Sequence, residues 1–412
     1  MTLKLTRPTS APWDDPANWW PALTAATHDL DAPVGVLAVE ALAANAFDML
    51  DRAAGLPIRV ASKSVRVRGV LDAVLALPGY RGILAYSLAE ALWLAADSPE
   101  REGHDDIVVG YPSADRGAIA RLAADEKLAS RVTLMVDDVA QLDLVDAVVA
   151  PNKRAVIRVA IELDASFRSR ALGHVGVRRS PVYSPADAEA LAEAVVARRG
   201  FRLVGMMAYE AQIAGVTNAG PRKAAIRAMQ RASAKELARR RGEAVRRVRA
   251  VADLEFVNGG GTGSIESTHA DPSVTEVAAG SGLFGPHLFD RYVHFTPAPA
   301  AAFALDVVRR PTADIATVLG GGWTASGPPA PDRVPKVVWP TGLKMLSRES
   351  AGEVQTPLQG AAARDLAIGD RVWLRHTKAG ELSEHLGAFA LVHNGALMGE
   401  LLTYRGEGRV FL

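Results

Sequence analysis

The stretch PIRVASKS, residues 57–64, shows the pattern on which the fold prediction depends. It is a short apolar run that ends in a polar segment containing Lys63. Seven further runs follow it along the chain: GILAY (82–86), DIVVG (106–110), RVTLMV (131–136), AVIRVAIEL (155–163), RLVGMMA (202–208), LEFVNG (254–259) and VTEVAAG (274–280). Short, continuous apolar runs are typical of strands that are buried on both faces.

Most of the segments between these runs have helical patterns. SLAEALWLAADS (87–98) has apolar residues at helical spacing after Ser87, and the segment 184–200 opens with Ser184 and Pro185 and ends on Gly200, which are helix start and stop signals. Eight strands alternating with helices predict an α/β fold with a parallel sheet, and their number allows closure into a (β/α)8 TIM barrel. An open doubly wound sheet is the alternative that periodicity alone does not exclude.

After about residue 295 the pattern changes to strand-like runs punctuated by Gly and Pro, which predicts a C-terminal β-rich domain. We therefore expect an N-terminal extension at 1–31, a barrel at 32–295 and a β domain at 296–412. The run PVGVLAV (33–39) precedes the barrel strands and is a candidate to pair with the β domain.

The composition excludes several classes of function. The chain has 412 residues, of which 49% are hydrophobic, and a formal net charge of +1, which does not favour a nucleic-acid partner. It contains no cysteine, which excludes disulfides, thiol nucleophiles and cysteine-based metal sites. We find no signal peptide and no apolar run near the roughly 18 residues of a membrane span, so we expect a cytoplasmic protein.

Two features place an amine and an anion site at one end of the predicted barrel. Lys63 follows the first strand, and active sites of these barrels lie at the carboxyl ends of the strands. The loop NGGGTGS (258–264) follows the seventh strand, and Gly280 and Ser281 follow the eighth, where barrels often bind phosphate. A phosphate site and a lysine that can form a Schiff base together indicate pyridoxal 5′-phosphate as the cofactor.

Two other positions are candidates for chemistry. Tyr209 closes the sixth strand and is either a core residue or a neighbour of the cofactor. His376 lies in RHTKAGELSEH, with Lys378, Glu381 and His385 after it. This segment has none of the usual zinc-binding spacings, so a structural role is favoured over a closed metal site.

With these motifs in this order, residues 30 to 400 resemble the fold-type III pyridoxal-phosphate enzymes, in the D-threonine aldolase and D-serine dehydratase branch. The segment RVASKSVR resembles that family's lysine segment, so the resemblance implies that Lys63 carries the cofactor. AYE (208–210) resembles the segment with its cofactor-side tyrosine. NGGGTGS and TEVAAGSG resemble its phosphate loops, which implies cofactor contacts from Gly260, Gly261, Thr262, Gly263, Gly280 and Ser281. The resemblance also implies the barrel and a homodimer.

The chain departs from the family at the divalent-metal site. The family has a histidine followed two residues later by cysteine or aspartate, whereas here His376 is followed by Lys378. An acidic and histidine-containing segment upstream is replaced by VQTPLQG (354–360). The resemblance therefore leaves His376 as one implied metal ligand, with the site either absent or rebuilt from Glu381 or His385. The family's arginine near the cofactor ring oxygen is matched, in a loose alignment, by His174 in LGHVGV.

The resemblance implies a lyase that acts on a β-hydroxy D-amino acid, by aldol cleavage or by dehydration, through an aldimine on Lys63, with Tyr209 near the reacting centre. An amino-acid racemase is the alternative, favoured by the altered metal pair. A non-catalytic protein that binds pyridoxal phosphate is a further alternative. The β-rich segment after residue 295 argues against it, because such carriers are single-domain barrels.

Overall fold

The computed structural model describes residues 3–328, 330–378 and 380–412. Contacts divide the chain into two compact units. The sheet unit comprises Met1–Asp48, Ser64–Val74 and Ser281–Val410, and the barrel unit comprises Met49–Lys63, Leu75–Gly280 and Phe411–Leu412. The three-part domain division expected from the sequence stays a prediction, because compactness does not show which segments fold on their own.

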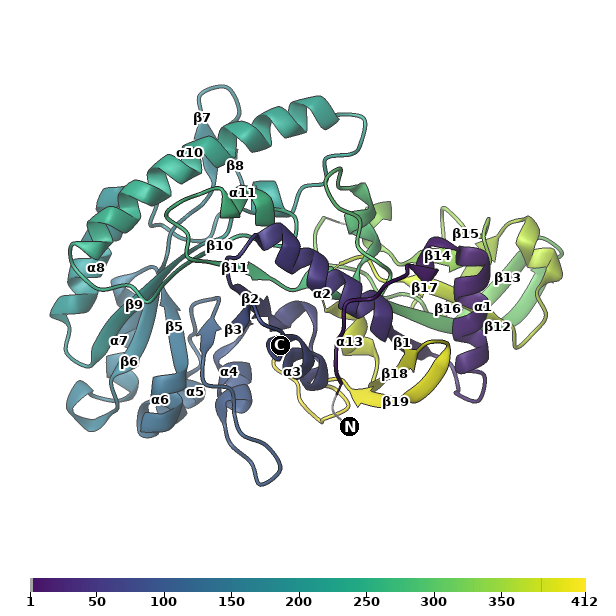
Figure 1. The fold of residues 1–412 in the computed structure, drawn as a ribbon, viewed down its shortest axis with the longest axis horizontal. Coiled ribbons are helices and arrows are strands. Elements are labelled where there is room, and N and C mark those ends of the chain that lie inside the picture. Colours follow the sequence, from purple (N-terminus) through teal and green to yellow (C-terminus); the bar gives the residue numbers. More distant parts are fainter. Residues whose placement is uncertain (1–2, 329, 379) are drawn as a thin grey trace. The chain divides into compact units, whose positions relative to one another are not determined.

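Eight parallel strands of the barrel unit close on themselves (Figure 1). In order around the barrel they are β10 (Phe256–Gly259), β11 (Glu276–Ala279), β2 (Ile58–Ala61), β3 (Tyr80–Ala85), β4 (Ile107–Val109), β5 (Val132–Val136), β6 (Ile157–Glu162) and β9 (Phe201–Ala208). Each coincides with one of the eight predicted runs, although β3 begins two residues and β9 one residue before the predicted start. The closing pairs place Val277 beside Ile58 and Phe256 beside Gly205, which excludes the open sheet and confirms the barrel.

Helices alternate with these strands and surround them (Figure 1). They are α4 (Leu88–Ala95), α5 (Arg116–Ala124), α6 (Glu126–Arg131), α7 (Val139–Val148), α8 (Pro185–Ala197), α9 (Ala211–Ala214), α10 (Lys223–Arg249) and α11 (Ile265–His269). The predicted caps are present, since the hydroxyls of Ser87 and Ser184 accept hydrogen bonds from the amides of Glu90 and Asp187. One element was not predicted, the hairpin of β7 (Phe167–Ser169) and β8 (Gly173–Val175).

The sheet unit is built on nine strands. They are β1 (Val34–Ala38), β12 (Ala301–Thr312), β13 (Ile315–Leu319), β14 (Lys336–Trp339), β15 (Lys344–Met345), β16 (Gln355–Gln359), β17 (Arg371–Arg375), β18 (Ala388–His393) and β19 (Ala396–Leu402). The main path runs β15-β16-β13-β12-β1-β18-β19, and β14 and β17 branch from β12. The early strand β1 thus lies inside this sheet, antiparallel to β12 and parallel to β18.

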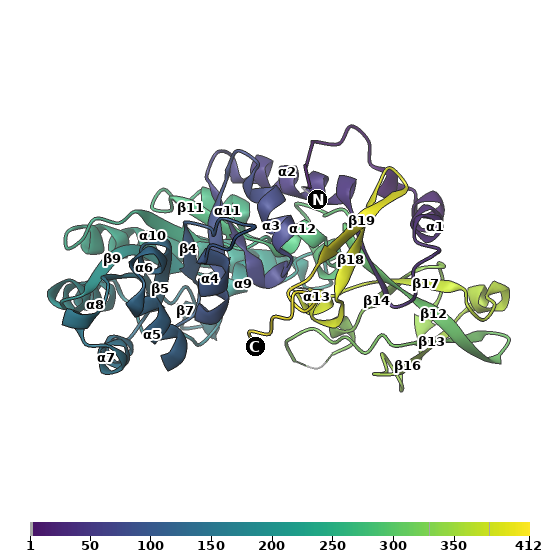
Figure 2. The same ribbon diagram turned by 90° about the horizontal axis from the view of Figure 1, so that it is seen from below.

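Two short helices, α12 (Ser281–Phe284) and α13 (Glu381–His385), belong to the sheet unit. The longer helices α2 (Val39–Ala53) and α3 (Arg68–Leu75) link its segments to those of the barrel unit along the chain. The N-terminal helix α1 (Pro16–Ala26) packs on β17 (Figure 2). The rings of Trp20 and Trp373 lie 5.8 Å apart, and the Trp373 indole N–H donates to the Thr24 hydroxyl over 2.8 Å. No helix among the described residues has the length and apolar character to cross a membrane.

Candidate active site at the carboxyl ends of the barrel strands

Lys63 lies directly after β2, in the short 3-10 helix Ser62–Ser64. The Ser62 hydroxyl donates to the carbonyl oxygen of Leu84 over 3.1 Å, which fixes this turn to strand β3. The Lys63 Nζ donates to the hydroxyl of Tyr111 over 3.0 Å. Tyr111 follows β4 after Gly110, so the amine and the phenol both project from the carboxyl ends of nearby barrel strands.

Tyr209 follows β9, and its partly buried ring packs against the apolar cluster inside the barrel. Burial raises the pKa of Tyr209 to about 12, although Arg179 opposes the shift. The guanidinium carbon of Arg179 lies 5.8 Å from the centre of the Tyr209 ring and 5.6 Å from that of Tyr111. Tyr209 therefore stays a neutral phenol near pH 7, and Arg179 links it to the tyrosine that contacts Lys63.

His174 lies in β8 of the hairpin after β6, where its ring Nε2 is 3.1 Å from the carbonyl oxygen of Val177. The cation that the structure brings to the two tyrosines is instead Arg179, five residues further along the chain. A cofactor contact from His174 stays a prediction, and Arg179 is the better placed candidate for that role.

The glycine-rich loop after β10 makes a tight turn. Gly260 has a φ of +88°, which L side chains rarely adopt, so this position favours glycine. Its amide donates to the Glu210 carboxylate over 3.1 Å, and the Gly261 amide donates to the Ser264 hydroxyl over 3.1 Å. These two amides are thus engaged within the loop, and the turn residues Thr262 and Gly263 become the better candidates to contact a phosphate.

Glu210 anchors this loop from beneath. Its side chain is buried, and it accepts hydrogen bonds from the amide of Gly260 and from the hydroxyl of Thr268. The buried Arg241 lies 3.7 Å from Glu210 and pairs with Asp271 over 2.8 Å. From the other side, the Arg52 guanidinium donates to the carbonyl oxygen of Thr262 over 2.6 Å. The loop is therefore held in shape by buried charged groups before any ligand binds.

Glu210→Ala is expected to weaken the binding of pyridoxal phosphate to the apoprotein about tenfold or more, because the Gly260 amide and the Thr268 hydroxyl lose their acceptor and the loop loosens. Fluorescence titration of the apoprotein measures this affinity. The matched control is Glu189→Ala. It removes a carboxylate of the outer helix α8 that pairs with Arg247 of α10, and it should leave the affinity unchanged. Equal affinities of the Glu210→Ala variant and the wild type would contradict the anchoring role.

The turn after β11 comes close to strand β2. A Cβ atom at Gly280 would lie 2.4 Å from the carbonyl oxygen of Ala61, so only glycine fits there. Ser281 begins α12, and its hydroxyl lies 3.2 Å from that of Ser64 within the sheet unit. A phosphate contact from Ser281 stays a prediction, as does one from Gly280.

Two carboxylates stand at the ends of neighbouring strands in the barrel mouth. Asp137 directly follows β5 and Glu162 ends β6, and these strands pair with Val136 beside Ile161. Burial, followed by repulsion from Asp137, raises the pKa of Glu162 to about 7, although Arg179 opposes the shift. Glu162 can therefore exchange a proton near neutral pH, which is the behaviour expected of an active-site acid or base.

The pKa of Glu162 also predicts a pH dependence of stability. In the unfolded chain the carboxyl ionises near its usual value of 4.5, whereas in the folded protein it keeps its proton to about pH 7. The folded state binds more protons in this window, so the free energy of unfolding falls by up to about 3 kcal/mol as the pH rises through it. Urea unfolding of the apoprotein should show this fall relative to Glu162→Gln. An identical pH profile for both proteins would contradict the assignment.

The residues around His376 do not fit a divalent metal. His376 is fully buried, both ring nitrogens lack a hydrogen-bond partner among the described residues, and burial lowers its pKa to about 3. Its neighbours include the Phe284 ring, 6.4 Å away, the cationic Arg375 and His287, whose Nε2 lies 3.0 Å from the carbonyl oxygen of Val334. Within the described ranges, no three His, Cys, Asp or Glu side chains are grouped so that they could hold an ion.

The residues considered as replacement metal ligands are engaged elsewhere. Glu381 accepts a hydrogen bond from the Lys378 amide over 2.7 Å, and burial raises the pKa of its carboxyl group. His385 stacks on Trp323 with ring centres 4.9 Å apart. The single implied ligand, His376, thus has too few companion donors among the described residues to hold an ion.

Several residues of the barrel mouth were missed by the sequence analysis, namely Arg52, Tyr111, Asp137, Glu162, Arg179 and Glu210. Four of them carry a signal in the sequence, because Tyr111, Asp137, Glu162 and Glu210 lie at or within two residues of the end of an apolar run. Polar residues at such positions face the active site of a barrel. Arg52 and Arg179 have no comparable signal, since a helix end and a long loop bring them to the mouth.

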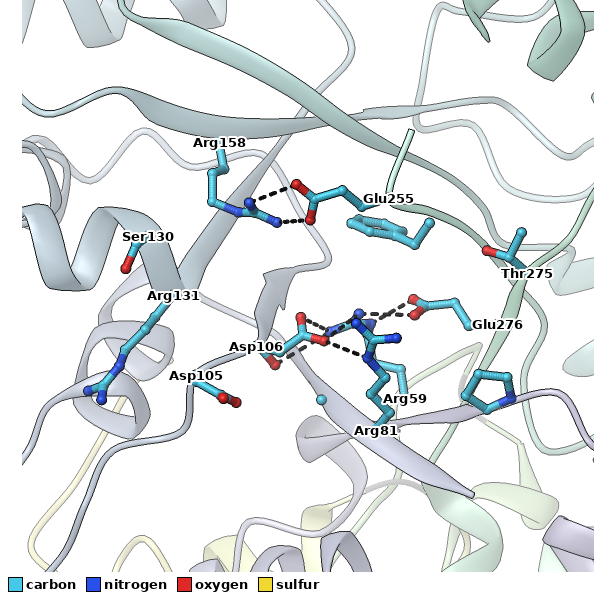
Figure 3. A pocket seen from close by; sticks show the side chains of 13 residues that line it. Arg59, Arg81, Asp105, Asp106, Ser130, Arg131, Arg158, Glu255, Thr275 and Glu276 are labelled. Carbon is cyan, nitrogen blue, oxygen red and sulfur yellow. Dashed lines mark hydrogen bonds and ion pairs between the residues drawn. The ribbon is translucent and has the colours of Figure 1, made fainter. Parts of the chain in front are cut away.

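The opposite end of the barrel contains a cavity of about 600 Å³, lined by residues at the amino ends of the strands (Figure 3). Arg59 lies at its centre and pairs with Glu276 and with Asp106, each over 2.7 Å. Arg158 pairs with Glu255 beside it. Paired charges at the amino-terminal face of a barrel indicate a stabilising role, so we do not place the active site here.

Comparisons with known proteins agree with this architecture. No protein-family model matches the chain, and a search of the curated proteins finds no match. Among solved structures, D-threonine aldolase from Filomicrobium marinum is 19% identical with a TM-score of 0.74, over 93% of this chain and 97% of that one. D-threo-3-hydroxyaspartate dehydratase from Delftia sp. HT23 is also 19% identical (TM-score 0.71, 91% and 97%). Alanine racemase from Bacillus anthracis is 14% identical (TM-score 0.57, 91% and 98%). The chain therefore has the barrel-and-sheet fold of the fold-type III pyridoxal-phosphate enzymes.

Proposed function

We propose that this chain is a pyridoxal-phosphate-dependent lyase that acts on a β-hydroxy D-amino acid. The observation that carries the proposal is the position of Lys63, at the carboxyl end of β2 with its Nζ 3.0 Å from the Tyr111 hydroxyl. An amine at this place, in a barrel whose strand β10 leads into a glycine turn, matches the two ends of the cofactor. A D-threonine aldolase and a dehydratase of a β-hydroxy amino acid are among the proteins of similar fold.

The barrel unit fits the cofactor at both ends. Lys63 would hold its carbonyl carbon, and the backbone of Thr262 and Gly263 would contact its phosphate. A Cβ atom at Gly261 would lie 2.9 Å from the Ala214 side chain and 3.2 Å from the Tyr209 ring, so this close packing of the turn favours glycine. When bound, pyridoxal phosphate takes up the electron pair of a bond that breaks at the substrate Cα.

Three side chains at the carboxyl ends of the barrel strands would share the proton transfer and the binding of the substrate. Tyr209, with its pKa near 12, keeps its proton and would donate a hydrogen bond to a bound oxygen. Glu162, with its pKa near 7, can take up or release a proton at the operating pH. Arg179 lies beside both tyrosine rings and offers a positive charge to the substrate carboxylate.

We expect turnover to be independent of a divalent metal, because the described residues around His376 include no group of three possible ligands and Lys378 adds a positive charge. Extensive dialysis against EDTA should leave turnover unchanged, and elemental analysis should find substoichiometric metal. Adding Mn²⁺ or Zn²⁺ back provides the comparison. A loss of activity on dialysis that either ion restores, together with one ion per chain, would contradict this prediction.

An amino-acid racemase is the second candidate, and Tyr111 beside Lys63 favours it, since racemisation needs a second proton-transfer group besides the lysine. A screen of D- and L-amino acids in deuterated water distinguishes a racemase from a lyase. A lyase gives a keto acid and ammonia, or glycine and an aldehyde. A racemase gives deuterium at Cα and loss of optical rotation without either product. No reaction of any amino acid by protein that binds the cofactor would leave a non-catalytic binding protein.

We also propose that the protein is a cytoplasmic homodimer. The edge strand β19 supports an interface in the sheet unit, because its Leu397, Met398 and Leu402 side chains are 40%, 48% and 52% exposed. Analytical ultracentrifugation of the purified protein tests the oligomeric state, and a monomer at micromolar concentration would contradict the dimer.

A further inference from the structure

Tyr111 is fixed in place by the barrel itself. The Gly110 amide donates to the carbonyl oxygen of Ala85 over 2.8 Å, which extends the pairing of β4 with β3 up to the residue before Tyr111. On the other side of β3, the Ser62 hydroxyl donates to Leu84 and holds the turn that contains Lys63. The segments that carry the two side chains, whose Lys63 Nζ and Tyr111 hydroxyl lie 3.0 Å apart, are therefore both anchored to β3.

Tyr111 is also surrounded by positive charge. The Lys63 Nζ and the Arg179 guanidinium carbon both lie 5.6 Å from the centre of its ring. A hydroxyl group accepts a hydrogen bond from an ammonium group and donates one to a neutral amine. Tyr111 can therefore stay bonded to Lys63 in either protonation state of the amine, which a proton relay requires.

We propose that Tyr111 is a catalytic acid that works as a pair with Lys63, and that the reaction of this site is dehydration. This inference rests on the proposed function. Lys63 takes the proton from the substrate Cα, so the C–H bond breaks and an ammonium group forms. The hydroxyl group on Cβ then needs a proton to leave, and the described residues around His376 form no metal site for that task.

The relay balances protons and electrons. Tyr111 gives its proton to the departing oxygen and receives one from the Lys63 ammonium group. The Cβ–O bond breaks with its electron pair on oxygen, the pair left at Cα forms the Cα–Cβ double bond, and water departs. Lys63 ends as a neutral amine and Tyr111 as a phenol, so both are restored. Aldol cleavage does not begin by breaking the Cα–H bond, so it would not give Lys63 the proton that this relay passes on.

The test compares Tyr111→Phe with the wild type in deuterated water, with D-serine and D-threonine as substrates. We expect exchange of the Cα proton to persist within about twofold, while the loss of water falls about a hundredfold or more, as for removal of a general acid. Tyr183→Phe is the matched control, because the Tyr183 ring packs on Arg168 and Arg240 and phenylalanine keeps that packing. It should leave both rates unchanged.

A second readout uses the apoprotein and does not depend on turnover. Trinitrobenzenesulfonate labels free amines, and mass spectrometry reports the rate at Lys63. Loss of the hydrogen bond from Lys63 should raise that rate about fivefold in Tyr111→Phe and leave it unchanged in Tyr183→Phe. Urea unfolding checks that each variant is folded.

The outcomes distinguish a failure of the role of Tyr111 from a failure of the proposed lyase function. An unchanged ratio of exchange to water loss in Tyr111→Phe, or an equal fall of both, would overturn the role of Tyr111 and leave the proposed lyase standing. Glycine and aldehyde as the wild-type products would overturn dehydration. A wild-type protein that exchanges no Cα proton and forms no product would overturn the proposed function, and with it catalysis by Tyr111.

Discussion

Lys63→Arg is expected to lower turnover at least about a thousandfold, because a guanidinium group keeps a positive charge but does not condense with the cofactor carbonyl. The substitution changes little else. Arginine can still donate to the Tyr111 hydroxyl, 3.0 Å from the present Nζ, so the surrounding side chains keep a partner. Product formation from the best substrate of the screen measures the effect.

The control for this prediction is Lys153→Arg, which makes the same chemical change at an exposed position of the barrel unit. It should leave turnover unchanged. Circular dichroism and urea unfolding should show that both variants are folded. If Lys63→Arg kept a tenth or more of the wild-type rate, another amine would have to carry the cofactor, and the assignment of the site would be wrong.

Arg59→Met is expected to lower the free energy of unfolding by about 3–5 kcal/mol. The Arg59 guanidinium is buried at the amino-terminal end of the barrel, where it donates to Glu276 over 2.7 and 3.0 Å and to Asp106 over 2.7 and 3.1 Å (Figure 3). Burial by itself lowers the pKa of Arg59, but the two carboxylates outweigh it, so the net shift is upward. Its removal leaves the buried Glu276 without its cation.

Arg81→Met is the matched control, because Arg81 lies 3.7 Å from the same Asp106 but is 74% exposed. Exposed ion pairs contribute about 0–1 kcal/mol, so this variant should unfold almost as the wild type does. The double variant Arg59→Met/Glu276→Gln should recover part of the loss, because it removes the unpaired charge. If urea unfolding gave the same cost for Arg59→Met and Arg81→Met, the buried network would not stabilise the barrel.

The arrangement of strands was predictable from the sequence because each barrel strand is buried on both faces. The runs around Val60, Val108 and Val257 are therefore mostly apolar, and their eightfold recurrence indicates a parallel sheet that can close into a barrel. The same rule gave no indication of the role of Arg59, because its charge is neutralised by Asp106 and Glu276, which lie 47 and 217 positions away in the sequence. The β7–β8 hairpin was missed because it interrupts a strand–helix connection without an apolar pattern of its own.

The candidate site was predictable only in part. Lys63 and the glycine turn are local features that a strand end and a run of small residues indicate. The contact of Lys63 with Tyr111 and the position of Arg179 depend on how separate loops meet above the barrel, which periodicity does not specify. The hydrogen bond from the Gly260 amide to the Glu210 carboxylate likewise depends on packing beneath the loop.

The most direct test of the central claim, that Lys63 carries pyridoxal phosphate, is an absorbance spectrum of the purified protein before and after borohydride, followed by peptide mapping of the reduced adduct. We predict a visible band from lysine-bound cofactor that disappears on reduction, with the adduct on the peptide that contains Lys63. An adduct on another lysine would contradict the site. The absence of any band after pyridoxal phosphate is added would contradict the cofactor and the proposed function with it.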